Sequence, residues 1–542
     1  MILTRRSSLA GAAAGLLLGA RRAAAAPAAR PVSGGSVTWG IETEPNTLNP
    51  HLNSQAKAKL VLRNVYESLL ARSPEGGYVP WLASAYTVSQ DGKTYTFTLR
   101  DDVTFSDGEK LDAAAVALNF TRLKDPAYSG SISAGMVSHV AEARAPDPRT
   151  VVLSLDQVYS PFLAGAASLP LISSRSFGSS QLKSGGTEIA GTGPFVLQRY
   201  ARGQDIRFVR NPAYRWAPST AGHQGPAYLE QITYRFLPES SVRTGALTSG
   251  QVDLIEGISG DDAGLFKDDP EFTYQSALNT ATPLTLFLNV AQGPTQDLLV
   301  RKAVQAAIDV DGIVRSIYRG SRTRAWGILS PADRDFYDAS IEHAYGFDPK
   351  RANALLDQAG WTARDAQGFR TKDGARLSIE VMQAQVTLRD QRDLLIQAAQ
   401  AQARQNAGID LVPILADSGT YTDRQNSGRY GAIPNSTTEQ EDGLTLYFHY
   451  LPRQSGGSIN YSRTEAPEVL ARLTAAAWTL DHRKRYDDYA ALQRLALLDQ
   501  VYGLPLYVPE DQIATSAKVH GAGFRSFKQL PENAYDIWIE RS

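Results

Sequence analysis

The residues of this chain that could carry out chemistry are mainly carboxylates, because cysteine is absent and histidine is sparse. Its 542 residues include 56 Asp and Glu, seven His and no Cys. Without cysteine the chain can form no disulfide, iron–sulfur cluster, thiolate zinc site or cysteine nucleophile. The histidines are scattered, and no pair has the spacing that places two metal ligands on one helix face. We therefore expect neither a resident metal nor another cofactor.

The short motifs of several enzyme classes are also missing. The sequence has no G-x-S-x-G nucleophile elbow, no H-E-x-x-H zinc motif, no P-loop and no G-x-G-x-x-G after a strand. The carboxylates are numerous enough that a glycosidase-type pair is compatible with the sequence. We expect a protein that is not an enzyme, with an exported hydrolase as the alternative.

The composition is that of a soluble globular protein. The hydrophobic share is 43% and the charged share 20%, and the length suits two to four domains with a large core. The formal net charge is −1, and outside the first thirty residues 50 basic groups stand against 56 acidic ones. This mild acidity gives no reason to expect nucleic acid or an anionic membrane as a partner.

The first thirty residues have the order of an export signal. Paired arginines, Arg5 and Arg6, precede an apolar run from Leu9 to Ala20 and an alanine-rich segment with small-x-small cleavage sites. This order is similar to a twin-arginine signal, and Sec export stays open because Ser8 stands where phenylalanine is usual. The run is too short to span a hydrocarbon core of ~30 Å. We expect 1–30 to be a signal peptide, and the exported protein to be soluble without a lipid anchor, since a lipobox needs cysteine.

The segment 80–120 contains the clearest local pattern. Apolar Tyr95, Phe97 and Leu99 alternate with threonines, which predicts a half-buried strand after the Asp91-Gly92 turn. A second short alternation is stopped at 106–108, and Asp112 can then cap a helix. The predicted order is strand, turn, strand, turn, helix.

Other strands and helices alternate along the rest of the chain without the rhythm of a barrel. Expected strands are 36–41, 151–155, 196–199, 206–209, 232–237, 250–254, 504–508 and 535–539. Expected helices are 56–70, 241–248, 298–308, 313–319, 349–359, 388–407, 467–478 and 483–500. Two α/β lobes with crossing strands fit this order better than one sheet.

Six separated segments resemble the signature regions of family 5 solute-binding proteins, the extracytoplasmic receptors of peptide, nickel and related ABC importers. They are Thr47–His51, Pro80–Phe120, Gly191–Phe195, Leu247–Leu254, Leu288–Asp309 and Phe347–Trp361. The resemblance covers nearly the whole chain after the signal. Each segment by itself is more typical of a turn or a packed helix than of a ligand contact.

The resemblance implies a type II periplasmic-binding-protein fold. This fold has two α/β lobes joined by a hinge, with an extra α/β domain on the first lobe and the ligand enclosed between the lobes. We expect the first lobe to combine 36–70, 205–285 and 510–542, the extra domain to cover 71–204, and the second lobe to cover 286–509.

The resemblance also implies which residues contact ligand. On the first lobe these follow the first strand and are Glu42, Thr43, Glu44 and Asn53. Asparagine offers a donor and an acceptor to a polar solute. On the second lobe Glu439 falls nearest the acid that pairs with a ligand ammonium in peptide-binding members, and Asp442 lies near a later acid. An enclosed carboxylate needs such a cation to offset its desolvation. The remaining candidates are Gln385, Tyr421, Thr437 and Thr438.

The chain departs from the family pattern at several of these positions. The tryptophan and the Pro-Asp-Pro of many relatives are replaced around Ser436 and Thr437, and the arginine that holds a dipeptide carboxylate falls near Ala384 or Gln385. These differences argue against dipeptide binding of the usual form. Nickel is disfavoured as well, because the aromatic and arginine partners of the nickel-binding branch are not matched in this sequence.

The resemblance predicts a monomeric periplasmic substrate-binding protein of an ABC importer. It would capture a small polar solute bearing an amine, such as a short peptide or an opine, and deliver it to permease subunits of the inner membrane. A non-transport receptor or chaperone of the same fold is the second alternative.

Overall fold

The structure is a computed structural model. It describes residues 30–53, 55, 58–128, 131–280, 282–333, 335–385, 388, 390–437, 444–453, 459–524 and 533–540. The predicted signal peptide lies outside these residues except for Arg30. By its internal contacts, Val32–Ser542 forms one compact unit, to which the following description is confined. No helix in the described ranges is long and apolar enough to cross a membrane.

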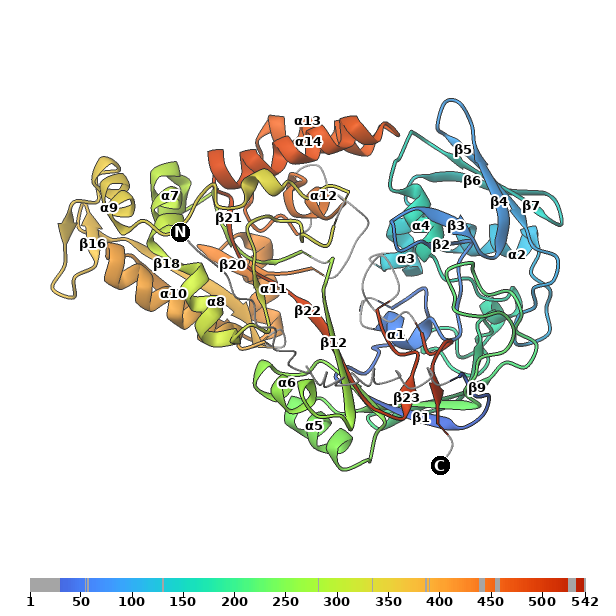
Figure 1. The fold of residues 1–542 in the computed structure, drawn as a ribbon. Helices are drawn as coiled ribbons and strands as arrows, with labels where there is room; N and C mark the ends of the chain where they lie inside the picture. The colour runs from blue at the N-terminus through green and yellow to red at the C-terminus, as the bar shows by residue number, and fades with distance from the viewer. Residues whose placement is uncertain are drawn as a thin grey trace, which may run out of the picture. The chain divides into compact units, whose positions relative to one another are not determined.

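A seven-stranded sheet contains both early and late parts of the chain (Figure 1). Its order is β12-β22-β11-β1-β10-β9-β8, and β1 runs parallel to both β10 and β11. The strands are β1 (Ser36–Ile41), β8 (Phe195–Ala201), β9 (Asp205–Arg210), β10 (Gln231–Phe236), β11 (Leu254–Glu256), β12 (Phe272–Leu278) and β22 (Glu510–Ser516). Helix α5 (Ser240–Thr248) packs on β1 and β11, and α6 (Gly260–Lys267) packs on β12.

A six-stranded sheet forms from the middle of the chain. Its order is β14-β21-β13-β20-β18-β19, in which β18 runs parallel to β19 and β20. The strands are β13 (Leu284–Leu288), β14 (Thr323–Arg324), β18 (Ser378–Ala384), β19 (Asp410–Ala416), β20 (Ala432–Asn435) and β21 (Gly503–Val508). Every residue of β13 and β21 is buried, as expected for central strands covered on both faces.

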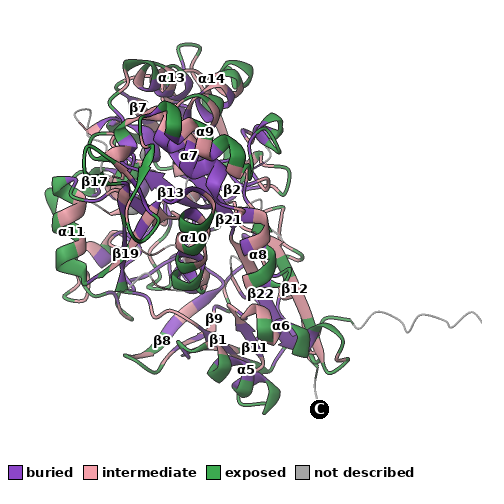
Figure 2. Cartoon of the chain, turned by 90° about the vertical axis from the view of Figure 1, so that its left-hand side faces the viewer, coloured by how far each residue is buried: buried purple, intermediate pink, exposed green. Residues whose placement is uncertain are grey.

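Several helices around this sheet have an aspartate as their N-cap. The helices are α7 (Leu298–Ala307), α8 (Val310–Tyr318), α9 (Pro349–Gln358), α10 (Arg392–Ala407), α11 (Ser418–Ser427), α12 (Leu444–Tyr450), α13 (Pro467–Ala477) and α14 (His482–Arg494). Side chains of Asp297, Asp309, Asp348, Asp417 and Asp481 accept N-terminal N–H groups of five of them. In Figure 2 most of α7 is purple, whereas α11, which buries no residue, is mainly green and pink.

A four-stranded antiparallel sheet lies in the region predicted as the extra domain. Its order is β4-β5-β7-β6, with β4 (Ala83–Val88), β5 (Thr94–Leu99), β6 (Val140–Asp147) and β7 (Thr150–Leu155). Helix α2 (Ala113–Arg122) packs on β6 and β7, and Asp112 caps it by accepting from Ala115 N at 2.8 Å. The predicted strand–turn–helix order of this segment is therefore found, although 103–105 contributes only a single bridge, Thr104 to Lys110.

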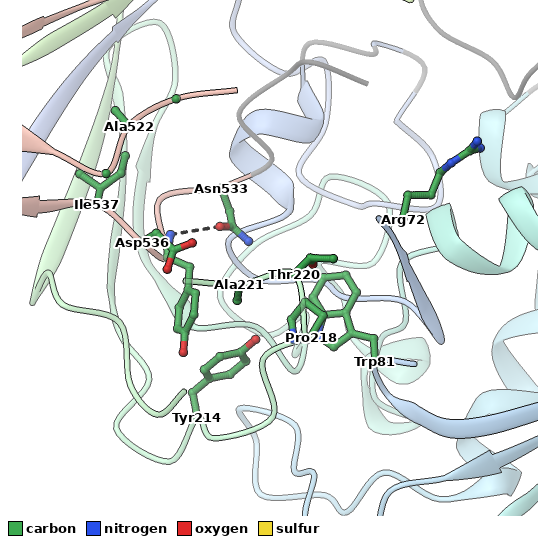
Figure 3. Close-up of a pocket in the computed structure, with 13 residues that line it drawn as sticks. Arg72, Trp81, Tyr214, Pro218, Thr220, Ala221, Ala522, Asn533, Asp536 and Ile537 are labelled. Carbon is green, nitrogen blue, oxygen red and sulfur yellow. Dashed lines mark hydrogen bonds between the residues drawn. The ribbon is translucent and has the colours of Figure 1, made fainter. Parts of the chain in front are cut away.

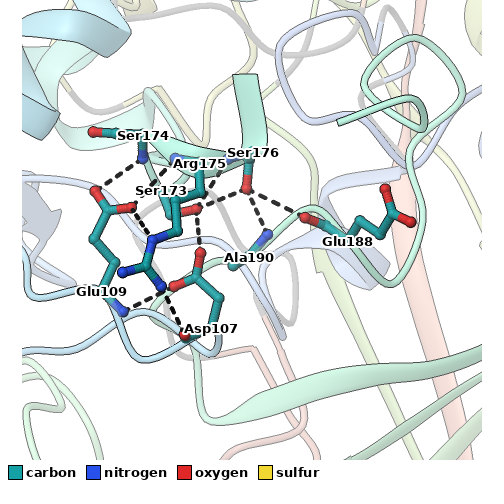
Figure 4. A network of polar contacts seen from close by, with 8 residues as sticks. All are labelled: Asp107, Glu109, Ser173, Ser174, Arg175, Ser176, Glu188 and Ala190. Carbon is teal, nitrogen blue, oxygen red and sulfur yellow. Dashed lines mark hydrogen bonds and ion pairs between the residues drawn. The ribbon is translucent and has the colours of Figure 1, made fainter. Parts of the chain in front are cut away.

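The Ser-Asp-Gly-Glu turn after β5 is held by a polar network (Figure 4). Asp107 Oδ2 accepts from Ser173 Oγ at 2.7 Å, and Glu109 accepts from the backbone N–H groups of Ser174 and Arg175 at 3.1 and 3.2 Å. Asp107 and Glu109 therefore bind the turn after β5 to the loop that contains Ser173–Arg175. This part of the 80–120 segment has a structural role.

The chain passes between the two large sheets at two places. It leaves β12 through 279–283 to reach β13, and it returns from β21 to β22 through Pro509. One hydrophobic cluster fills the seven-stranded and four-stranded sheets, and a separate cluster fills the six-stranded one. The six-stranded sheet therefore has a core of its own, and we call the parts built on the seven-stranded and six-stranded sheets the first and second lobe.

Several predicted elements differ from the observed ones. The helix expected over 56–70 is only α1 (Lys59–Leu62), followed by turns and by β2 (Leu70–Arg72), which pairs with β3 (Tyr78–Pro80). Asn64 ends α1, because its Nδ2 donates to the carbonyls of Leu60 and Val61, both at 3.0 Å.

Three further strands lie elsewhere than expected. Strand β8, expected at the end of the extra domain, pairs with β9 in the seven-stranded sheet. The strand expected at 250–254 is β11, which begins at Leu254, and the last strand is β24 (Trp538–Ile539), paired with β23 (Val519–His520).

Candidate functional site

A cavity with a volume of about 380 Å³ lies between the two lobes. We call it the interlobe cavity. It opens where β1, β11 and β20 end, and the carboxyl ends of parallel strands are the usual place for a ligand in α/β folds. Its lining includes Glu42, Arg243, Glu256, Asn279, Arg322, Asp390, Arg392, Ser436, Thr437, Pro509, Glu510 and Asp511.

The first-lobe wall of this cavity carries acids held around one arginine. The Glu42 backbone N–H donates to Glu256 Oε1 at 3.0 Å. Arg243, only 2% exposed, donates to the carbonyls of Leu237 and Glu256 at 2.6 and 2.9 Å, among others. Arg243 therefore connects the ends of β10 and β11 near the carboxylates of Glu42 and Glu256.

The second-lobe wall carries two arginines and one aspartate. Arg322 Nη2 lies 3.0 Å from Asp390 Oδ1, and Tyr507 Oη donates to Asp390 Oδ2 at 3.2 Å. Arg392 donates to Tyr507 Oη at 3.2 Å and to Ser436 Oγ at 2.8 Å. The two walls thus present charges of both signs to one space.

Thr437, one of the predicted ligand residues, lines the interlobe cavity beside 279–283, the segment that connects β12 to β13. Its Oγ1 lies 2.7 Å from Thr282 Oγ1 and 3.2 Å from His449 Nε2. Burial lowers the pKa of His449 to about 3, so its imidazole is neutral at physiological pH. The hydroxyl pair and the imidazole therefore form an uncharged network that fixes the start of the loop after β20.

Two of the predicted first-lobe residues, Glu44 and Asn53, are hydrogen-bonded to other parts of that lobe. Glu44 Oε1 accepts from Tyr200 Oη at 2.5 Å and from Gly203 N at 3.1 Å. Asn53 is 6% exposed, and its amide donates to Asn46 Oδ1 at 2.9 Å and accepts from Gln55 N at 2.8 Å. Asn53 also lines a small cavity of about 40 Å³, which the interlobe cavity does not include.

The remaining predicted residues are dispersed or lie outside the described residues. Gln385 is exposed just after β18, and half-buried Tyr421 lies on α11. Thr438, Glu439 and Asp442 lie outside the described residues. Among the described residues, Glu42 and Thr437 are the predicted side chains that line the interlobe cavity.

A buried carboxyl group lies apart from this cavity, in the core of the first lobe. Glu67 is fully buried and accepts from Tyr214 Oη at 2.7 Å and from Thr192 Oγ1 and Trp216 Nε1, both at 2.9 Å. Burial raises the pKa of Glu67 to about 8, although the three donors oppose this effect. Tyr214 also lines a cavity of about 80 Å³ that includes Arg72 and Asn533 (Figure 3).

Most of the charged lining of the interlobe cavity was not predicted. Arg243, Arg322, Asp390 and Arg392 belong to no recognisable motif, and arginines are usually exposed on the surface. Glu42 is the exception, because it was predicted as a ligand residue from its position directly after the first strand. Within the described part of the chain, no cluster of three or more His, Asp or Glu could hold a metal ion. Chemically, the cavity can bind a polar molecule that carries charge.

Comparison with known families identifies the class of protein. The model of the bacterial extracellular solute-binding proteins, family 5, matches residues 77–454. The chain belongs to this family, and the family consists of binding proteins. The predicted resemblance and the type II periplasmic-binding-protein fold are thereby confirmed.

Individual relatives are 28–31% identical to this chain over the residues that align. The nickel-binding periplasmic protein of Escherichia coli K12 is 31% identical over 410 residues, covering 74% of this chain and 75% of the relative. Protein XP55 of Streptomyces lividans is 30% identical over 470 residues, covering 86% and 82%. The glutathione-binding protein GsiB of Escherichia coli is 28% identical over 58% of this chain and 59% of its own length.

Solved structures show the same fold. NikA from Brucella suis, in complex with Fe(III)-EDTA, superposes with a TM-score of 0.80 at 27% identity, covering 93% of this chain and all of that one. DppA from Helicobacter pylori, in complex with the peptide STSA, superposes with a TM-score of 0.76 at 22% identity, covering 94% and 99%.

Proposed function

We propose that this chain is the substrate-binding protein of an ABC importer, which captures a small polar solute between its lobes and delivers it to the permease. The family membership carries this proposal, and the interlobe cavity supports it, because both lobes contribute polar side chains to one cavity. A ligand that contacts both lobes stabilises their closed arrangement by its differential affinity for that state. Closure then presents a surface that a permease can recognise.

The proposal includes the location and the organisation of the protein. The chain acts in the periplasm as a soluble monomer after removal of residues 1–30 by the twin-arginine or Sec route. The proposed organisation comprises a discontinuous first lobe, an extra domain and a second lobe over 286–509. Strand β8 is moved to the first lobe, because it pairs there with β9.

The solute we propose carries an amine. Glu439 occupies the position nearest the ammonium-binding acid of peptide-binding relatives, and Glu42 and Glu256 line the first-lobe wall of the cavity. Carboxylates that become enclosed when the lobes close require a cation or hydrogen-bond donors. A short peptide or an opine satisfies this requirement.

The first experiment is a thermal-shift screen on the mature protein, unfolded and refolded to remove any bound solute. The panel contains di- to pentapeptides, opines, polyamines, sugars and nickel chelates. A ligand at 100 times its dissociation constant adds about 2.7 kcal/mol to stability, so a true ligand raises the melting temperature. A blank across the panel, with refolding verified by circular dichroism, would count against capture of an amine-bearing solute.

Titration calorimetry with the solute found in this way tests the role of Glu439. We expect Glu439→Gln to weaken binding at least tenfold, because it removes the charge that faces the ammonium. Glu468→Gln, at an exposed position in the first turn of α13, is the control. Equal affinities for the two variants would contradict ammonium pairing by Glu439.

A further inference from the structure

Leu480, in the turn between α13 and α14, packs on a turn of the four-stranded sheet. Gly92 forms that turn between β4 and β5 with a φ of 70°, and it is buried although Asp91 and Lys93 on either side are exposed. A Cβ at Gly92 would lie 3.0 Å from Leu480 Cδ1 and 3.4 Å from Val158 Cγ2. The positive φ and the close approach both favour glycine. A second-lobe side chain therefore covers the tip of this hairpin.

A charged contact joins the same two parts of the chain. Arg72 Nη2 lies 4.0 Å from Asp335 Oδ2. Arg72 ends β2, which pairs with β3, and β3 contacts β4 of the four-stranded sheet. Asp335 belongs to the second lobe, between β14 and α9. The two side chains are 5% and 30% exposed, so salt screens this pair less than it screens a fully exposed pair.

Asp335 is fixed to the same end of the second lobe as Leu480. The next residue, Phe336, is buried, and its carbonyl accepts from Gln493 Nε2 on α14 at 2.8 Å. The Phe336 ring stacks on His482, the first residue of α14, with 5.2 Å between the ring centroids. His482 Nε2 also lies 3.9 Å from Asp335 Oδ1. The apolar and the charged contact therefore move together with α14.

The opposite partners belong to the first-lobe side. One hydrophobic cluster includes Phe97 of β5, Val151 of β7 and Ile232 of β10, so the four-stranded sheet shares a core with the seven-stranded one. Ser160, which follows β7, donates from its backbone and its hydroxyl to carbonyls at the end of α13. The four-stranded-sheet region can therefore transmit a force from the second lobe to the first.

These contacts lie away from the two segments that connect the lobes. The connections run through 279–283 and Pro509, and Asn279 and Pro509 both line the interlobe cavity. Its lining includes none of Arg72, Gly92, Asp335 and Leu480. In Figure 1, α13 and α14 extend toward the four-stranded sheet on one side of the molecule, and the crossing strands β12 and β22 lie on the other. A rotation of the second lobe about its connections would therefore break these contacts.

We propose that Leu480 and Asp335 form a clasp with Gly92 and Arg72, which stabilises the closed arrangement of the lobes independently of the solute. The clasp consists of protein atoms outside the interlobe cavity, so it contributes to closure whether or not a solute is bound. The apparent dissociation constant equals the intrinsic one divided by the closed fraction. The clasp thus sets how much of its binding energy a solute must spend on closure. Its meaning for uptake rests on the proposed function, but it can be tested without a solute.

The test measures the closed-to-open ratio of the stripped mature protein by single-molecule energy transfer. The chain has no cysteine, so Glu142→Cys on β6 and Lys350→Cys on α9, both exposed, carry the two dyes. We expect Leu480→Ala to lower the ratio at least threefold, because alanine lacks the methyl groups that cover the β4–β5 turn. Leu415→Ala, at a similarly exposed position on β19, is the control. Equal ratios in the wild type and in Leu480→Ala would overturn the proposal.

Two further variants separate the apolar from the charged contact. Leu480→Met keeps an apolar side chain of similar volume and should retain the wild-type ratio. Asp335→Asn removes the charge that faces Arg72, so we expect a ratio at least twofold lower and a weaker response to sodium chloride than in the wild type. A ratio in the double variant Leu480→Ala/Asp335→Asn equal to that of the wild type would also overturn the clasp.

The clasp and the proposed function fail separately. For any solute found in the screen, Leu480→Ala should raise the dissociation constant by the factor by which it lowers the closed fraction of the solute-free protein. An unchanged dissociation constant despite a lower closed fraction would overturn the role of the clasp in affinity and leave solute capture standing. A closed fraction that depends on Leu480, with no solute bound from the panel, would instead count against the proposed function.

Discussion

The backbone N–H of Ser160 donates to the carbonyl of Ala477 at 2.9 Å. Ser160 lies between β7 and α4 (Phe162–Ser168), and Ala477 is the last residue of the second-lobe helix α13. The Ser160 hydroxyl also donates to the Ala476 carbonyl at 3.3 Å. Carbonyls at the end of a helix lack intrahelical partners, and here a loop of the four-stranded-sheet region satisfies two of them. The four-stranded-sheet region therefore contacts the second lobe at a place remote in sequence from the two segments that connect the lobes.

This contact should contribute to solute affinity. Ser160→Ala removes the hydroxyl bond, which is worth about 0.5–1.5 kcal/mol, and we expect the dissociation constant for the solute to rise about two- to tenfold. The measurement is titration calorimetry, and Ser138→Ala, at an exposed position before β6, is the control. Indistinguishable affinities of these two variants would mean that the contact does not favour the closed state.

Glu67 should make the protein less stable as the pH rises. Its pKa is about 8 in the folded protein against 4.5 for an ordinary glutamate, so the native state binds the proton more tightly than the unfolded state. The stabilising effect is full below pH 4.5 and is lost as the pH rises toward 8, with a slope of at most about 1.4 kcal/mol per pH unit.

Urea unfolding between pH 5 and 8 tests this dependence. Glu67→Gln should flatten the decline in unfolding free energy, even though the variant is less stable at pH 5 because its amide N–H₂ faces a donor. Glu75→Gln, at an exposed position, should keep the wild-type slope. A wild-type slope in Glu67→Gln would assign the pH dependence to other groups.

We expect substitution of Asn53 to lower the stability of the protein, because its side chain is hydrogen-bonded within the first lobe. Its amide bonds to Asn46, to the Thr47 carbonyl at 3.1 Å and to the Gln55 N–H within the first lobe. Asn53→Ala should lower the unfolding free energy by about 1–3 kcal/mol, because buried partners lose their bonds. Asn426→Ala, at an exposed position on α11, is the control in chemical denaturation. Unchanged stability with weakened solute binding would restore the predicted ligand role.

Arg243 should be intolerant of its most conservative replacement. Its guanidinium donates to carbonyls at the ends of β10 and β11, a fork that the ammonium of lysine cannot reproduce. We expect Arg243→Lys to cost about 1–3 kcal/mol, whereas Arg235→Lys, exposed on β10, should be neutral. Equal unfolding midpoints in urea for these variants would show that the carbonyls find other donors.

Local signals predicted much of the fold. The Asp348-Pro349 start and the Gly360 end bracket α9 closely, and the alternation of Tyr95, Phe97 and Leu99 gives β5. These elements were predictable because their termini and periodicity are set within a few residues. Their assignment to lobes required the family resemblance, since β1 and β22 join one sheet from opposite ends of the chain.

Predictions failed where distant backbone approaches the element. A helix through 56–70 is interrupted at Asn64, and a Cβ at Gly193 would lie 2.4 Å from the Asn64 carbonyl oxygen. The chain at this point is shaped by a loop more than a hundred residues away. The same limitation applies to the site, because Asp390 and Tyr507, which are distant in sequence from each other, link Arg322 and Arg392 at the cavity.

The connection between the two lobes determines how the protein could be engineered by lobe exchange or circular permutation. The chain departs at Asn279 and returns at Pro509, and the strands on either side of the excursion, β13 and β21, are hydrogen-bonded neighbours, with Leu284 opposite Tyr507. The second lobe is in effect a cassette whose two ends lie together on a core of its own. It could be replaced by the corresponding lobe of a relative, or the chain could be given new termini within it. Neither change would alter the strand order of the seven-stranded sheet.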